Sequence, residues 1–300
     1  MIIQADNLHK AFGRHDALRG ASFAVPQGAA YALIGANGAG KTTTIKVLMN
    51  ILTPSQGSAT VLGVDSRALS PRELAQIGYV SENTELPGGL SVAAYLAYWR
   101  PFYPNWDAGL EHSLLAQFGL PPGRKIRDLS HGMRMKLAVV AALAYRPRLL
   151  ILDEPFSGID PLVRDELMEV LLAQAGEITV FISSHELSEI EGMVSHVGFL
   201  EDGKLLFQNA MEDLSARLRD VRVTLESVAA LPQGAPATWL NPRAEGNVLT
   251  FVDTQYSQAE LGPRLTALLG PVARIEAQPM GLRAMFTALA RSAKNAGDPA

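Results

Sequence analysis

A glycine-rich turn between an apolar run and a helical pattern constrains the fold of this chain most strongly. Its residues are Gly35, Ala36, Asn37, Gly38, Ala39, Gly40, Lys41 and Thr42, which match the pattern G-x-x-x-x-G-K-[ST] in full. The apolar run Tyr31 to Ile34 precedes the turn, and a helical pattern from Thr42 to Leu52 follows it. Glycines let backbone N–H groups face inward, and the helix N-terminus adds partial positive charge, so this arrangement is suited to polyphosphate.

Three side chains of this turn have expected roles in a nucleotide site. We expect Lys41 to reach the β and γ phosphates, and the Thr42 hydroxyl to ligate Mg²⁺. Thr43, next in the first helical turn, is expected to bond the α phosphate. The sequence therefore predicts a site for ATP with Mg²⁺.

Two carboxylates at the end of a second apolar run would complete such a site. Asp153 and Glu154 directly follow the run Leu149 to Leu152. In open parallel sheets, ligands bind beyond the carboxyl ends of the strands. We expect Asp153 to hold Mg²⁺, directly or through water, and Glu154 to act as the general base that polarises the attacking water.

Strand and helix patterns alternate up to about residue 210, which predicts an α/β fold. The continuous apolar runs Ala30 to Ile34, Leu149 to Leu152 and Val180 to Ile182 are typical of strands buried on both faces of a parallel sheet. Before them, residues 2 to 25 indicate short strands without intervening helices. Phe199 to Phe207 predicts a hairpin that turns within residues 201 to 204.

Several helix ends can also be predicted. Ser70 to Glu73 has the composition of a capping box with proline at the first helical position. Asp160 before Pro161 predicts a helix start, and Gly176 the end of that helix. Ser183 and Glu186 form a second possible capping box, which would leave His185 at the start of a helix.

Beyond residue 210 the pattern changes to that of a small α+β unit. The elements expected there are a helix from Met211 to Arg219, strands Val221 to Leu225 and Val248 to Val252 on either side of a Pro/Gly/Ala-rich loop, and helices near Gln258 to Leu269 and Gly281 to Ala290. We expect one domain over residues 1–210, a second over 211–290, and a disordered tail over 291–300.

Bulk composition excludes several classes of protein. The chain has 300 residues and no cysteine, which excludes disulfides, thiol catalysis and Cys-ligated metals. A net charge of −4 argues against a nucleic-acid partner. The longest apolar candidate, Leu137 to Tyr145, is far shorter than the roughly 18 residues of a membrane span. We expect a soluble, cytoplasmic chain, with any membrane spans supplied by another subunit.

Further motifs make residues 1–210 resemble the ATPase of the ATP-binding-cassette (ABC) family. Leu129 to Met133 matches the family's signature loop, and the resemblance implies that Ser130 and Gly132 contact the γ phosphate of ATP bound to a partner subunit. Ser130 also reads as the N-cap of a helix running to about Arg146. Ser157 to Asp160 matches the D-loop, although Asp160 is equally an ordinary helix start.

The resemblance adds two more site residues and shows two departures. His185 resembles the switch histidine that senses the γ phosphate, and Phe12 the aromatic that stacks on adenine, although an aromatic on an early strand is more often in the core. Glu82 stands where the family has a glutamine that touches Mg²⁺ or water, so its carboxylate is expected near the metal. His131-Gly132-Met133 replaces the usual Gly-Gly-Gln.

The resemblance implies the full ABC-ATPase fold and its partners. This fold is a P-loop NTPase with a mixed, largely parallel sheet, an N-terminal antiparallel β subdomain and a helical subdomain at about residues 83–146. Each active site needs two chains, so we expect an ATP-dependent dimer, most simply a homodimer, bound to a separate transmembrane permease at the cytoplasmic face of the membrane. The aromatic stretch Tyr95 to Asp107 and Glu82 resemble the branch of antibiotic and lipid exporters. Half of those rings are expected to fill the subdomain core, and the exposed rest to receive a coupling helix of the permease.

Three alternatives stay open at this point. A soluble ABC ATPase acting on ribosomes or DNA usually has two cassettes or long coiled-coil insertions, which this chain lacks. A P-loop kinase would lack the signature and the D-loop. A regulatory subunit that hydrolyses ATP weakly and pairs with an active ATPase fits Glu82 and the altered signature, while Glu154 argues against it.

Overall fold

The computed structural model describes residues 1–174, 176–227, 231–232 and 235–297, with side chains up to residue 292. The chain divides into two compact units, Met1–Gln208 and Asn209–Ala300. The elements of the first unit are β1 (Ile3–Phe12), β2 (His15–Val25), β3 (Ala30–Ile34), α1 (Lys41–Leu48), β4 (Gln56–Val61), β5 (Val64–Asp65), α2 (Pro71–Leu74), β6 (Ile77–Ser81), α3 (Val92–Trp99), α4 (Ala108–Gln117), α5 (His131–Leu143), β7 (Leu149–Asp153), α6 (Pro161–Ala173), β8 (Thr179–Ser184), β9 (His196–Glu201) and β10 (Lys204–Ala210).

A six-stranded sheet of order β10-β9-β3-β8-β7-β6 forms the centre of the first unit. The pairs β9–β3, β3–β8, β8–β7 and β7–β6 are all parallel. Every residue of β7 and β8 is buried, because each strand is covered on both faces. This confirms the parallel sheet predicted from the continuous apolar runs. The carboxyl ends of β3, β7 and β8 lie side by side at one edge, where ligands bind in such sheets.

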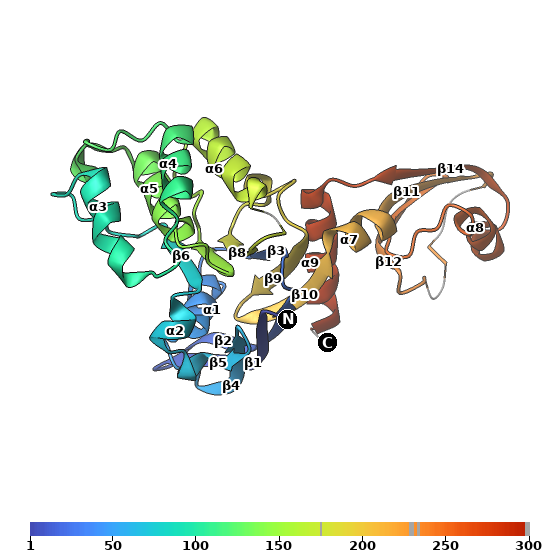
Figure 1. Ribbon diagram of the computed structural model, residues 1–300. Helices are drawn as coiled ribbons and strands as arrows, with labels where there is room; N and C mark the ends of the chain where they lie inside the picture. The colour runs from blue at the N-terminus through green and yellow to red at the C-terminus, as the bar shows by residue number, and fades with distance from the viewer. Residues whose placement is uncertain (175, 228–230, 233–234, 298–300) are drawn as a thin grey trace. The chain divides into compact units, whose positions relative to one another are not determined.

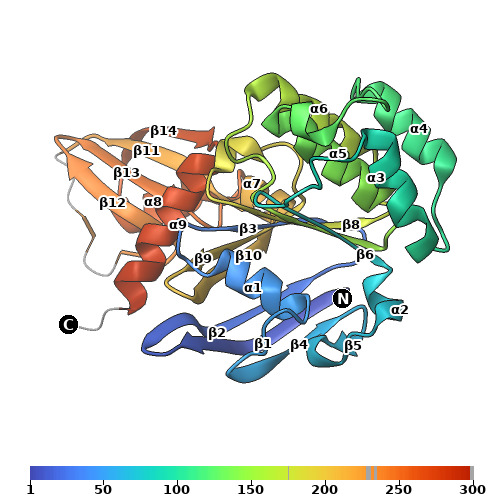
Figure 2. The same cartoon turned by 90° about the vertical axis from the view of Figure 1, so that its left-hand side faces the viewer.

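A second, antiparallel sheet of order β2-β1-β4-β5 lies beneath α1 (Figure 2). Helix α1 contributes Ile45, Val47 and Leu48 to one apolar core shared by both sheets. Helices α5 and α6 cover the opposite face of the central sheet, with α3 and α4 beyond them (Figure 2). The phosphate loop thus leads from the central sheet into a helix that packs between the two sheets.

The second unit is an antiparallel sheet with helices. Its elements are α7 (Met211–Arg217), β11 (Arg219–Leu225), β12 (Trp239–Glu245), β13 (Val248–Asp253), α8 (Leu261–Leu269), β14 (Val272–Pro279) and α9 (Leu282–Gly297). The strand order is β12-β13-β11-β14; Figure 2 labels all four strands, and Figure 1 labels β11, β12 and β14. Leu261 and Leu265 of α8 pack with Val221, Val223 and Phe251 of the sheet in one apolar cluster.

Three expectations for secondary structure were wrong. The loop predicted after Leu225 contains β12, and β14 was not predicted. Residues 291–297, expected to be disordered, continue α9, since extending a helix that has already formed adds one backbone hydrogen bond for each residue fixed. Residues 298–300 lie outside the described residues.

The capping box predicted over Ser183 to Glu186 is also wrong. Ser183 lies within β8, which ends at Ser184, and the 3₁₀ turn Leu187–Glu189 that follows has no side-chain cap. The box at Ser70 and Glu73 is confirmed, with both reciprocal bonds present.

Candidate functional site

The phosphate loop is fixed by close packing that only glycine permits at two positions. A Cβ atom at Gly35 would lie 2.2 Å from the Leu200 carbonyl oxygen. Gly40 caps α1 with a φ of 107°, and a Cβ there would lie 2.5 Å from the Ala17 carbonyl oxygen. Between them, Ala36, Asn37 and Gly38 are exposed, while Ala39 is buried. The middle of the loop is therefore exposed to solvent, while its two ends are packed against neighbouring backbone.

Lys41 is the first residue of α1, and its charge lies directly under this loop. The side chain is only 5% exposed, and Nζ donates to the carbonyl oxygens of Gly35 and Ala36 over 2.6 and 3.1 Å. Nζ also pairs with Oε1 of Glu154 at 2.9 Å. A buried ammonium beside an exposed loop backbone is suited to an anion.

Thr42, in the first turn of α1, and Asp153, the last residue of β7, lie in direct contact. The Thr42 hydroxyl donates to Oδ1 of Asp153 over 3.1 Å, and the Ser183 hydroxyl donates to the same oxygen over 2.7 Å. Burial raises the pKa of the Asp153 carboxyl, and the hydrogen bonds from Ser183 and Thr42 oppose that shift. Hydroxyl and carboxylate oxygens are the ligands that Mg²⁺ prefers, so this pair fits the expected metal.

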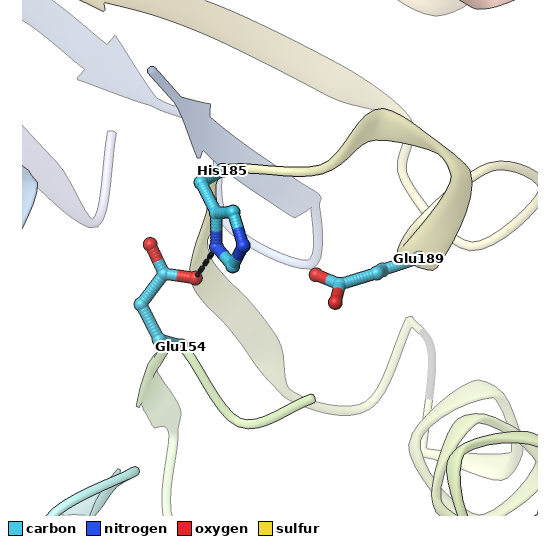
Figure 3. Close-up of side chains that lie close together, drawn as sticks. All are labelled: Glu154, His185 and Glu189. Carbon is cyan, nitrogen blue, oxygen red and sulfur yellow. Dashed lines mark hydrogen bonds and ion pairs between the residues drawn. The ribbon is translucent and has the colours of Figure 1, made fainter. Parts of the chain in front are cut away.

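Glu154 occupies a strained backbone position next to this pair. Its φ is 52°, a left-handed conformation that is uncommon for residues other than glycine. Its N–H donates to the Ser183 hydroxyl over 3.0 Å. Oε2 accepts a hydrogen bond from Nδ1 of His185 at 2.8 Å (Figure 3). The expected general base and the expected switch histidine are thus direct partners.

His185 lies in the loop after β8 rather than at a helix start. Its hydrogen bond to Glu154 raises the pKa of its imidazole, against partial burial; the nearby charges of Glu154 and Glu189 act in the same direction, and Lys41 opposes them. Ser183 is unavailable as a helix cap because its hydroxyl bonds Asp153 and Glu154. This arrangement points the imidazole to the carboxylate of Glu154 (Figure 3).

Glu82 meets this cluster through its backbone, while its side chain turns elsewhere. The Glu82 N–H donates to the Asp153 carbonyl oxygen over 2.9 Å. Its carboxylate Oε1 accepts a hydrogen bond from the Ser157 hydroxyl over 2.9 Å. The carboxylate expected at the metal therefore bonds the loop that follows Glu154.

Ser130, Gly132 and Asp160 form a separate group at the starts of α5 and α6. The Ser130 hydroxyl accepts from the Met133 N–H over 3.2 Å, which confirms it as an N-cap. Asp160 accepts from the N–H groups of Leu162 and Val163, both at 3.1 Å. Gly132 is buried, because α5 packs there against α6.

Two further predicted site residues, Phe12 and Thr43, are partly or largely exposed. The Phe12 ring ends β1 and is 48% exposed, so it is not a core residue; Lys10 Nζ lies 5.2 Å from its centroid. Thr43 is half-buried in the first turn of α1. Both side chains are therefore accessible to a ligand.

Three residues that the structure places among these groups were not predicted as site residues: Ser183, Ser157 and Glu189. Ser183 joins Asp153 to Glu154, Ser157 bonds Glu82, and Glu189 lies near His185. Ser183 was predicted only as a helix cap, and Ser157 only as part of the D-loop match, although a polar Ser183 after an apolar run was a usable signal. Nothing local indicates that Ser157 contacts Glu82 or that Glu189 lies near His185, because these contacts depend on how the loops fold.

Comparison with known proteins identifies the family. The model of the ABC transporter family matches residues 18–157. The lantibiotic transport ATP-binding protein SrtF of Streptococcus pyogenes is 35% identical over 69% of this chain and 90% of its own length. The bacitracin transport ATP-binding protein BcrA of Bacillus licheniformis is 34% identical over 73% and 72%, and the linearmycin resistance ATP-binding protein LnrL of Bacillus subtilis is 32% identical over 72% of both chains.

Solved structures agree. An ATP-binding subunit of an ABC transporter superposes with a TM-score of 0.66 at 27% identity, covering 72% of this chain and 92% of that one. A dimeric ATP-binding cassette with bound ADP and Pi shares the fold, with a TM-score of 0.61 at 20% identity over 70% of this chain and 98% of that one. Among the described residues, no helix is long and apolar enough to cross a membrane. The chain belongs to the ABC transporter family, among its ATP-binding cassette subunits.

Proposed function

We propose that this chain hydrolyses ATP with Mg²⁺ as one half of a cassette dimer and thereby drives export through a separate permease. One observation carries the proposal: a continuous chain of contacts runs from Thr42 through Asp153, Ser183 and Glu154 to Lys41 and His185. This network supports the proposal because it joins the oxygen pair of Thr42 and Asp153, the buried ammonium of Lys41 and the carboxylate of Glu154.

In the proposed reaction each group of this network has one task. The loop amides and Lys41 hold the β and γ phosphates, and Thr42 and Asp153 hold Mg²⁺, whose charge neutralises the phosphate oxygens. Phe12 stacks on the adenine, and Thr43 bonds the α phosphate. Glu154 accepts the proton of the attacking water, and His185 donates a hydrogen bond to the γ phosphate. Catalysis is then mainly positioning and electrostatic stabilisation.

The partner copy supplies the remaining contacts in this proposal. Ser130 and Gly132 present the N-terminus of α5, whose N–H groups and dipole favour an anion, to the γ phosphate bound by the other chain. Asp160 crosses the same interface. ATP bridges the two chains and hydrolysis releases them. The dimer therefore alternates between a closed and an open state, and this change can drive a conformational change in the permease.

An aromatic surface on residues 83–146 supports docking to a permease at the cytoplasmic face of a membrane. A groove of about 330 Å³ is lined by Tyr79, Tyr95, Trp99, Tyr103 and Tyr145, among others. Tyr95 and Tyr145 are buried, whereas Tyr98 and Phe102 are 59% and 60% exposed. We propose that the exposed rings receive a helix of the permease. The double variant Tyr98→Ala/Phe102→Ala should no longer co-purify with the permease. Leu172→Ala, which changes an exposed residue of α6, should co-purify as the wild type does. Unchanged binding of the double variant contradicts the proposed docking surface.

The cargo follows only from relatives. SrtF, BcrA and LnrL are named for lantibiotic transport, bacitracin transport and linearmycin resistance. We propose that this chain likewise serves the export of an antimicrobial compound or lipid.

A weakly hydrolytic subunit that pairs with a second, active ATPase is the other candidate. Glu82 and the His131-Gly132-Met133 signature favour it. The ATPase rate should be measured against protein concentration for the wild type, Glu154→Gln and Ser130→Arg. A rate that rises faster than linearly and is lost in both variants supports a hydrolytic homodimer. A wild-type rate as low as that of Glu154→Gln, with ATP binding intact, favours the regulatory candidate.

A further inference from the structure

The imidazole of His185 lies between two carboxylates rather than beside one. Glu154 Oε2 accepts from Nδ1 at 2.8 Å, and Glu189 approaches from the other side of the ring (Figure 3). One carboxylate oxygen of each acid and one ring nitrogen all lie within 4.8 Å of one another. The charged groups around His185 are therefore Glu154, Glu189 and, with the opposite sign of effect, Lys41.

Glu189 is held in place independently of His185. Its side chain accepts a hydrogen bond from the Ser184 hydroxyl over 2.6 Å, and both residues are buried, at 8% and 1% exposure. Within the described part of the chain, Glu189 makes no ion pair with lysine or arginine. A buried carboxylate costs free energy unless a positive charge or several donors compensate it. The nearby imidazolium form of His185 is such a charge.

Glu154 has a second task besides its bond to His185. Its Oε1 contacts Lys41 and its Oε2 contacts His185, and as general base it must turn one carboxylate oxygen toward water. Whenever Oε2 takes that task, His185 loses the hydrogen bond that contributes most to its raised pKa. Glu189 has no such second task, because its only hydrogen-bond donor in the described structure is Ser184.

We propose that Glu189 is a positioning residue that keeps His185 charged and oriented while Glu154 engages water. An imidazolium has N–H donors on both nitrogens, so it can donate to the γ phosphate and to a second acceptor at once. The inference rests on the proposed role of His185. A purely structural Glu189 would need only to accept the Ser184 hydroxyl, which an uncharged glutamine does equally well.

The substitution Glu189→Gln therefore removes the negative charge of Glu189 and keeps an acceptor for the Ser184 hydroxyl. The full chain with ¹³C-labelled histidine is titrated by NMR, with the His185 signal assigned from a His185→Asn variant. Removing a nearby negative charge lowers the pKa of an imidazole, so the His185 pKa should fall in Glu189→Gln. It should fall further in Glu154→Gln/Glu189→Gln than in Glu154→Gln alone, by roughly threefold in the dissociation constant. Equal values in the single and double variants overturn the inference.

Two controls separate charge from structure. Glu186→Gln makes the same charge change at an exposed residue of the same loop, and should leave the His185 pKa unchanged. Ser184→Ala keeps the charge of Glu189 and removes its hydrogen bond, so the His185 pKa should stay above that of Glu189→Gln. A fall in Ser184→Ala as large as in Glu189→Gln would assign the effect to the hydrogen bond and contradict the inference.

Turnover gives the second readout. In Glu189→Gln the decline of the ATPase rate at high pH should begin at a lower pH than in the wild type, in step with the fall of the His185 pKa measured by NMR. Glu189→Asp should move the start of this decline part of the way back toward the wild-type pH. An unshifted profile overturns the inference. The two hypotheses fail separately: wild-type turnover in His185→Ala contradicts the proposed function of His185, whereas the NMR titration tests Glu189 without any turnover.

Discussion

The hydroxyl of Ser157 donates a hydrogen bond to Oε1 of Glu82 over 2.9 Å. The carbonyl oxygen of the same serine lies 3.3 Å from Nε2 of His131. Because a carbonyl oxygen only accepts, His131 presents its Nε2–H there. Glu82 and His131 stand where the ABC pattern has glutamine and glycine, so both departures meet at one residue of the loop after Glu154. This loop is thus tied to the start of α5 and to the end of β6.

Glu82→Gln should separate the charge of Glu82 from this contact. A glutamine keeps an oxygen acceptor for Ser157, so the melting temperature should stay within about 1 °C. The loss of one negative charge near the proposed metal should raise the Mg²⁺ concentration for half-maximal ATPase activity by roughly tenfold, which corresponds to about 1.4 kcal/mol.

Ser157→Ala is the matched control, because it breaks the contact and keeps the charge. Its Mg²⁺ dependence should resemble that of the wild type. If Glu82→Gln also leaves the Mg²⁺ dependence unchanged, the Glu82 carboxylate stays with Ser157 and does not meet the metal.

Gly132 should prove to have a packing role besides its proposed contact with phosphate. A Cβ at this position would lie 2.8 Å from Cγ1 of Val163 in α6. Gly132→Ala should therefore destabilise the chain by about 1–2 kcal/mol, after the gain in helix propensity of roughly 1 kcal/mol is subtracted. Chemical denaturation followed by circular dichroism measures the change.

Val163→Ala removes the clashing methyl groups and allows the two roles to be distinguished. In the Val163→Ala background, Gly132→Ala should be nearly neutral for stability, so the two substitutions couple by about 1–2 kcal/mol. If the ATPase rate then stays low although stability is regained, the glycine is needed at the nucleotide as well. Recovery of both would leave packing as its whole role.

The central sheet could be predicted because its strands have a strong local signal. Leu149 to Leu152 and Val180 to Ile182 are apolar at every position, as strands covered on both faces must be, and β7 and β8 include them. The hairpin prediction is confirmed with a two-residue loop, Asp202-Gly203, in which both residues have positive φ. Such a loop suits the twist of paired strands.

The two strands that were missed are the two edges of the sheet in the second unit. In the order β12-β13-β11-β14, the outer strands pair on one side only. β12 contains Pro242, which lacks an N–H donor and is tolerated at an edge, and most of β14 is exposed or half-buried. Because edge strands bury little, their sequences show weak alternation, and local patterns could not identify them.

In the site, motifs predicted the residues but not all of their contacts. The phosphate loop, Asp153, Glu154 and His185 do converge, since the strands that bear them end at one edge. The sequence could not show that Glu82 turns to Ser157, or that Ser183 bonds two carboxylate-bearing neighbours. These contacts depend on loop conformations, such as the φ of 52° at Glu154, that no local pattern determines.

Glu111 should be essential to the stability of the aromatic region of residues 95–111. It is buried and accepts from Arg100 Nε at 3.0 Å and Nη2 at 2.7 Å, and from Trp106 Nε1 at 2.7 Å. Glu111→Ala leaves three donors without an acceptor, so it should cost about 2–4 kcal/mol in the free energy of unfolding. Glu85→Ala, at an exposed position, should cost less than about 0.5 kcal/mol. A comparable cost for both contradicts the assignment.

Ser183→Ala should impair both stability and turnover, because one buried hydroxyl bonds both Asp153 and Glu154. Ser183 is fully buried, donates to Asp153 Oδ1 and accepts from the Glu154 N–H. Its loss leaves the Glu154 N–H unpaired and leaves Asp153 Oδ1 with Thr42 as its remaining donor, which should cost about 1–3 kcal/mol. The left-handed backbone of Glu154 costs of order 1 kcal/mol and depends on such support, so Glu154 should leave its position and the ATPase rate should fall at least tenfold. Ser188→Ala, an exposed serine in the same loop, provides the comparison and should match the wild type in both measurements. Full turnover in a destabilised Ser183→Ala would mean that Asp153 and Thr42 alone keep the general base in place.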